Sequence, residues 1–98
     1  MTSSLAELTV GDFEPLSGES FRLLASAYEL ELKLAEIRRL GQARREGGAF
    51  SLLFIAPPGQ FLPQAIYPIT HPVLGTLDLF IVPLGAMEGG NAYQAVFT

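Results

Sequence analysis

The most regular hydrophobic pattern in the chain lies at residues 28–40, YELELKLAEIRRL. Leu30, Leu32 and Leu34 alternate with charged residues, as the buried face of a half-exposed strand requires. The same residues are good helix formers, and Leu30 and Leu34 also fit a helical stripe. On a helix, however, Leu32 would point away from them into solvent. We therefore predict a strand here and keep a helix as the alternative.

Short apolar runs bounded by turn residues predict further strands in the second half of the chain. Pro57-Pro58-Gly59 ends one of these runs, and GAMEGGN at residues 85–91 predicts a flexible loop between two others. Pro68 interrupts a third run and suits an edge position or a bulge, because proline lacks a backbone donor. These predicted strands cover residues 49–57, 64–70, 76–82 and 92–98.

The only histidine of the chain, His71, lies at a predicted corner. His71-Pro72-Val73-Leu74 fits a β-turn with proline at its second position, and Gly75 can adopt the positive φ that follows. A residue before proline is biased to extended geometry. We predict that the turn joins strands 64–70 and 76–82 as a hairpin, and that His71 is structural.

Near the N-terminus, Ser4 with Glu7 and Thr9 with Asp12 are possible capping boxes for single helical turns. Pro15 limits any helix there, so short turns are predicted to lead into FRLL at residues 21–24. The whole pattern predicts one all-β domain, residues 1–98, with a short helical turn near its N-terminus. We expect a compact antiparallel barrel or two-sheet sandwich of about six or seven short strands.

Charged residues are few and are concentrated in the first half of the chain. Hydrophobic residues make up 49% of the chain and charged residues only 16%, against about 25% charged residues in an average soluble protein. Fourteen of the sixteen charged residues precede residue 47. With so little charge in its second half, the domain is expected to have part of its surface covered by another molecule.

Several partner classes are disfavoured by the same numbers. The net charge of −4 argues against nucleic acid, for which a basic face supplies most of the affinity. The apolar runs fall short of the roughly 20 residues that a membrane-spanning helix needs. The N-terminal residues lack a basic segment followed by an apolar one, so no secretory signal is expected. These features favour a cytoplasmic location.

Candidate chemistry is sparse. Disulfides, thiolate catalysis and thiolate zinc sites are excluded because the chain has no cysteine. No G-x-S-x-G elbow accompanies the single histidine, so a serine hydrolase is not indicated. Asp12, Glu14 and Glu19 lack the spacing of a calcium loop. We therefore expect no enzyme activity, no metal site and no cofactor.

Two segments are candidate contact sites. The apolar turn PPGQFLP, residues 57–63, either plugs one end of a barrel or contacts another molecule. The final strand either is paired on both sides or offers a free edge to another chain. The candidate interface residues are Pro57, Pro58, Phe61, Leu62, Tyr93, Val96 and Phe97.

Four blocks of the sequence together carry a family resemblance: LTVGDFEPLSGESFRL, AFSLLF, LPQAIYPITHPVLGTLDLFIVP and YQAVFT. In that order they resemble the signature of a family of small bacterial domains of unknown function, in which Ala65 is usually a glycine. The resemblance implies an all-β domain without known catalytic residues. Members are often encoded near phage-tail-like or tail-collar-like fibre proteins, which implies a part in a tail, fibre or surface assembly. The resemblance also implies a location in a phage-like particle as the alternative to the cytoplasm.

The leading hypothesis is a non-catalytic structural or interaction protein. It would associate with itself or dock onto a phage-tail-like, fibre or surface assembly. The alternative is a module that binds a carbohydrate or a small apolar molecule, either in a cavity between the sheets or on an aromatic platform. The platform would use Tyr67, Phe80 or Tyr93.

Overall fold

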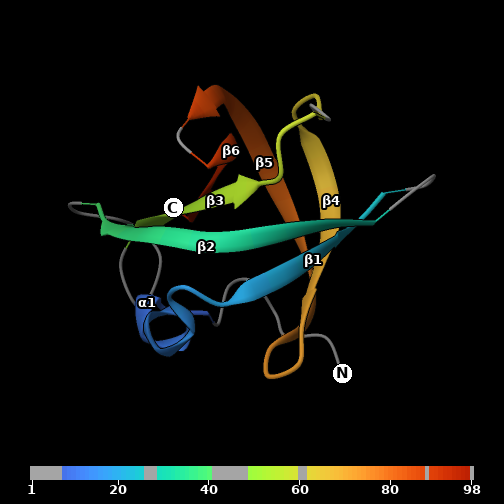
Figure 1. Cartoon of the computed structure of the whole chain (residues 1–98). Coiled ribbons are helices and arrows are strands. Elements are labelled where there is room, and N and C mark those ends of the chain that lie inside the picture. The colour runs from blue at the N-terminus through green and yellow to red at the C-terminus, as the bar shows by residue number, and fades with distance from the viewer. Residues whose placement is uncertain (1–7, 26–28, 41–48, 60–61, 88, 98) are drawn as a thin grey trace.

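Strands dominate the computed structural model (Figure 1), which describes residues 8–25, 29–40, 49–59, 62–87 and 89–97. In this part of the chain, six antiparallel strands form a closed barrel, which confirms the predicted all-β class and selects the barrel over the sandwich. The strands are β1 (Ser20–Leu24), β2 (Glu29–Arg39), β3 (Phe50–Ala56), β4 (Ala65–His71), β5 (Gly75–Met87) and β6 (Gly90–Phe97). Before them come a short α-helix, α1 (Val10–Phe13), and a 3₁₀ turn, η2 (Glu14–Leu16).

Around the barrel the strand order is β1-β2-β3-β6-β5-β4, and β4 closes the ring against β1. Two meanders, β1-β2-β3 and β4-β5-β6, are joined by a crossover from the end of β3 to the start of β4. The final strand, β6, pairs with β3 on one side and with β5 on the other. The alternative that β6 offers a free edge is therefore wrong.

The ambiguous segment at residues 28–40 forms the long strand β2, as predicted. Leu32 and Leu34 are fully buried inside the barrel, and the charged residues between them are exposed. The pairing of β2 with β3 shifts between Leu34 and Glu36, which marks a β-bulge. After the bulge the inward positions change phase, so that Ile37 packs against the core and Arg38 faces outward.

The predicted loop at residues 85–91 is wrong for most of its length. β5 continues to Met87 and β6 begins at Gly90, so the two strands meet in a tight turn. The register shifts between Pro83 and Gly85, and Gly85 adopts a φ of 106°. A glycine in this conformation forms a bulge that allows the ladder to continue, and such a glycine looks like a loop signal in the sequence.

The predicted hairpin around His71 is confirmed. His71 of β4 pairs with Gly75 of β5, residues 72–74 form the turn, and Gly75 has a φ of 77°. Pro68 lies opposite Asp78 in the same hairpin. Among the described residues, β4 pairs with β1 only through Ile69 and Thr70, so Pro68 lies beyond the paired part of that edge.

The barrel is filled by its own side chains and closed at both ends. At one end Phe13 of α1 packs against Phe50 and Phe97, with ring centroids 5.7 and 5.6 Å apart. The Thr9 N–H donates to Asp12 Oδ2 at 2.8 Å and so caps α1, as predicted for this pair. The Ser4–Glu7 pair lies outside the described residues.

At the other end of the barrel, the crossover from β3 to β4 buries Leu62, whose backbone N–H donates to the Tyr93 hydroxyl at 2.9 Å. In the part of the chain described, no helix has the length and apolar character needed to cross a membrane.

Candidate functional site

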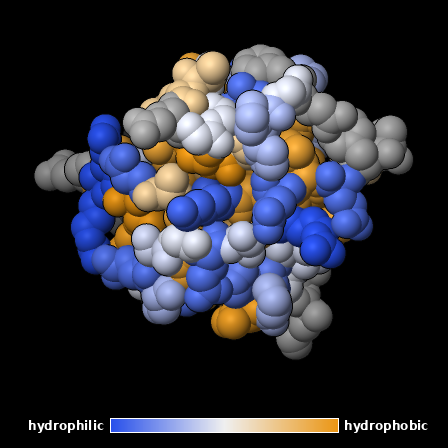
Figure 2. Space-filling view, viewed as in Figure 1, coloured by the Kyte–Doolittle hydropathy of each residue, from blue (hydrophilic) through white to orange (hydrophobic). Residues whose placement is uncertain are grey.

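The outer surface of the barrel divides into a polar side and an apolar side. On β1 and β2 the outward positions are polar or charged and exposed, and Arg22 forms an ion pair with Glu29 at 3.6 Å. Figure 2 shows this side, where hydrophilic side chains lie over the two strands. The outward residues of this side include Ser20, Arg22, Glu29, Glu31 and Lys33.

On β4, β5 and β6, by contrast, several outward side chains are apolar. We define the apolar outer face as the outward side chains of Ile66, Phe80, Val82, Leu84 and Val96. Four of them expose about half of their area or more: Ile66 65%, Phe80 51%, Leu84 50% and Val96 48%.

Register places three of these residues in one row across the barrel. Ile66 pairs with Phe80, and the pairing of Ile81 with Ala95 brings Phe80 opposite Val96. A continuous apolar patch of this kind on a soluble protein marks a contact surface more often than isolated exposed side chains do.

Polar groups surround the apolar outer face. On its β2 side a pocket of about 220 Å³ is lined by Leu53, Leu84 and Gln94 together with Glu36 and Arg38. Arg38 and Glu36 form an exposed ion pair with an Nη2–Oε1 distance of 3.0 Å. On the other flank Asp78 lies two residues before Phe80 on β5. An apolar centre with a charged rim is the usual anatomy of a protein–protein interface.

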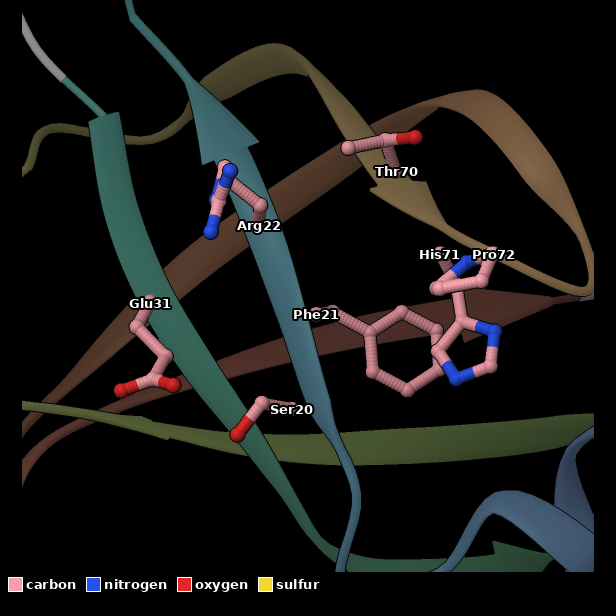
Figure 3. Close-up of a pocket in the computed structure, with 7 residues that line it drawn as sticks. All are labelled: Ser20, Phe21, Arg22, Glu31, Thr70, His71 and Pro72. Carbon is pink, nitrogen blue, oxygen red and sulfur yellow. The ribbon is translucent and has the colours of Figure 1, made fainter.

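A second pocket, of about 340 Å³, lies where β1 meets the end of β4 (Figure 3). His71 is buried there, and its ring packs on Phe21 with centroids 4.7 Å apart. His71 Nδ1 accepts the Val73 N–H at 3.0 Å, so the ring proton resides on Nε2, which donates to Glu19 Oε1 at 2.8 Å. The Nδ1 bond thus closes the hairpin turn on itself, and the Nε2 bond holds the turn against Glu19, directly before β1.

The remaining groups of this pocket point away from the histidine. In Figure 3, Ser20, Arg22 and Glu31 project from the outer side of β1 and β2, whereas Phe21 faces His71. Among the described residues, His71 has no hydrogen bond to a serine hydroxyl, and Ser51 lies across the barrel on β3. The arrangement positions a turn and assembles no nucleophile–base pair.

No cluster of three or more His, Asp or Glu side chains that could hold a metal ion occurs within the described ranges. Several exposed glutamates are paired with arginines: Glu14 with Arg39 at 3.3 Å, Glu29 with Arg22, and Glu36 with Arg38.

The candidate interface residues are distributed between the surface and the core. Pro57, Pro58 and Val96 are exposed. The side chains of Leu62, Tyr93 and Phe97 are buried, and Leu62 closes a barrel end. Phe61 lies outside the described residues.

Phe80 was predicted only as part of a ligand platform, and Ile66, Val82 and Leu84 were not predicted as contact residues. The sequence did contain a signal for an apolar outer surface on β5. Leu77, Leu79 and Ile81 fill the core, so the apolar residues that alternate with them must face outward.

The three aromatic residues proposed for a ligand platform do not share a surface. Tyr67 donates its hydroxyl to the Pro63 carbonyl oxygen at 2.9 Å and packs against the core, Phe80 faces outward, and Tyr93 is fully buried. An open apolar groove of about 570 Å³ does lie near Tyr67 and Leu62, at the barrel end.

Comparison with curated proteins and with solved structures finds no match. A family model does match, and it spans residues 8–97, nearly the whole chain, so it includes every strand of the barrel. The chain therefore belongs to the family described as a domain of unknown function, DUF6916.

Proposed function

We propose that this domain is a non-catalytic interaction module that binds another protein through its apolar outer face. The observation that supports the proposal is the row of Ile66, Phe80 and Val96, all about half exposed or more, across three adjacent strands. Burying side chains of this kind contributes about 1.5–3 kcal/mol each. A row of three therefore supplies a substantial part of the free energy that a stable complex needs.

The backbone of this surface favours recognition by side chains over strand addition. β5 and β6 are each paired on both sides, so their backbone groups are already used within the barrel. A partner must pack onto the outward side chains, with Phe80 as the central aromatic contact, which is the residue type that dominates many interfaces.

The chemistry of the surface supports protein over other partners. The polar side carries both signs of charge, with Arg22 and Lys33 among Glu29 and Glu31, and so offers no basic stripe for nucleic acid. The apolar outer face lacks the lysines and arginines that attach peripheral proteins to anionic lipid.

We further propose which class of protein the partner is: a component of a phage-tail-like, fibre or surface assembly. It rests on the family resemblance of the four sequence blocks. A small closed barrel with a single apolar side suits such a role, because it stacks or docks on one side and remains hydrated on the other.

The test compares proteins that co-purify with the tagged chain and with two variants of equal charge change. Phe80→Asp places a charge in the apolar outer face, and Ser20→Asp places the same charge on the polar side. We expect Phe80→Asp to weaken specific association about 10- to 100-fold, from the loss of one buried phenylalanine. Ser20→Asp should bind as wild type does.

Circular dichroism melts of both variants verify that the barrel is intact. The proposal is contradicted when no association, with another protein or between copies, depends on Phe80.

A further inference from the structure

We propose that His71 is a pH switch for the β4–β5 turn: when the ring gains a second proton, it releases the turn and keeps its bond to Glu19. This inference is independent of the apolar outer face and of any partner bound there. It is carried by the different chemistry of the two hydrogen bonds that the ring makes.

The switch consists of one buried ring between two partners of different kinds. The His71 side chain is only 4% exposed, whereas the Glu19 side chain that it meets is 50% exposed. Nδ1 accepts a hydrogen bond from the backbone N–H of Val73, 3.0 Å away, and Nε2 donates to the Glu19 carboxylate, 2.8 Å away. Only a neutral ring makes both bonds, because the Val73 N–H is a donor and needs an unprotonated nitrogen.

Protonation of the ring acts on the two bonds in opposite directions. The second proton goes to Nδ1, where it sets one N–H against the N–H of Val73 and removes the acceptor that this N–H uses. The Nε2 bond becomes a charge-assisted bond to a carboxylate, which is stronger than a neutral one. Histidine ordinarily gains this proton between about pH 5 and pH 8. Mild acid is therefore expected to free the turn and to keep the link to Glu19.

Charged groups of the neighbouring strands surround the switch. Glu19 directly precedes β1, and Arg22 of β1 and Glu31 of β2 line the pocket beside the ring (Figure 3). Lys33 lies two residues after Glu31 on β2. The turn itself carries no charged side chain, and the first charged residue of β5, Asp78, lies farther along that strand. Of these groups, Glu19 is the one within hydrogen-bond distance of the ring, so its carboxylate is the one to remove in a test.

The segment that the switch releases lies on the surface. Val73 is 74% exposed, and Pro72 beside it forms part of the wall of the pocket. Ile69 and Thr70 pair with β1 independently of the ring, so the barrel remains closed when the turn moves. The switch therefore couples proton uptake to the position of an exposed turn and leaves the barrel folded.

The experiment is an NMR titration of the full chain between about pH 8 and pH 5. The ¹⁵N chemical shifts of the His71 ring identify which nitrogen carries a proton. Amide hydrogen exchange, corrected for the intrinsic rate at each pH, measures opening of the turn. As Nδ1 gains its proton, protection of the Val73 amide is expected to fall about fivefold, which corresponds to the loss of one hydrogen bond. The amides of Ile69 and Thr70 should keep their protection.

Three variants separate the switch from a general effect of acid. Glu19→Gln removes the carboxylate that favours the charged ring, so the turn should be released at lower pH than in the wild type. Glu36→Gln is the matched control: it makes the same charge change at a residue paired with Arg38, and it should leave the pH of release unchanged. In His71→Gln, which has no titratable ring, Val73 protection should not change across this pH range.

Loss of Val73 protection together with protonation of Nδ1, at lower pH in Glu19→Gln, supports the switch. A ring whose Nδ1 carries a proton throughout, or gains none down to about pH 5, overturns it. A Val73 amide that is indifferent to protonation overturns it as well, as does release at the same or higher pH in Glu19→Gln. Loss of protection at Ile69 and Thr70 at the same pH would show acid unfolding of the barrel and would also contradict the proposal.

Discussion

His71 is held by two hydrogen bonds, one with the Glu19 carboxylate and one with the Val73 N–H, and by one ring contact with Phe21. The sequence predicted its place at a β-turn, because proline at the next position and Gly75 are local signals. It could not predict Glu19, which lies 52 positions away and reaches His71 only when β1 and β4 close the barrel.

His71→Ala is expected to lower the free energy of unfolding by about 1–3 kcal/mol, because it removes the buried ring and both hydrogen bonds. Glu19→Gln keeps an oxygen acceptor opposite Nε2 and is expected to cost less than half as much. Chemical denaturation of both variants provides the measurement. An alanine variant as stable as wild type would refute the structural role of the ring.

At the scale of strands, the sequence predicted positions better than it predicted boundaries. Alternation along residues 28–40 identified β2, since Leu32 had no buried position on a helix. The bulge after Leu34 and the continuation of β5 through Gly85 depend on the register with the next strand, β3 and β6 respectively, and alternation within one strand does not reveal that register. A glycine that forms a bulge cannot be separated by sequence from one that forms a loop.

Gly90, the first residue of β6, is the glycine whose replacement is expected to reduce stability most. It has a φ of 147°, and a Cβ there would overlap the carbonyl oxygen of Ala56 on β3. Gly90→Ala is therefore expected to destabilise the protein by more than about 2 kcal/mol. Gly11→Ala is the control: its Cβ would lie 3.5 Å from Thr9 Oγ1, an ordinary contact in α1. Thermal unfolding should show a large loss for the first variant and little or none for the second.

For the whole molecule, the sequence predicted a poorly charged half but could not locate the surface that results. The apolar outer face exists because β4, β5 and β6 are adjacent in the order β1-β2-β3-β6-β5-β4. These strands form a meander of consecutive hairpins, so Ile66, Phe80 and Val96 become neighbours through the registers of the β4–β5 and β5–β6 hairpins. The burial of Leu62 at one barrel end could be predicted from the sequence, because Leu62 is an apolar residue in a turn that would ordinarily be polar.

The contact role of the apolar outer face is tested most directly by native mass spectrometry of the complexes that co-purify with the tagged wild-type chain, with Phe80→Asp and with Ser20→Asp. The expected result is a complex, with another protein or between copies of the chain, that is lost in Phe80→Asp and retained in Ser20→Asp. Complexes of equal abundance for all three proteins, or no complex for any of them, would contradict it.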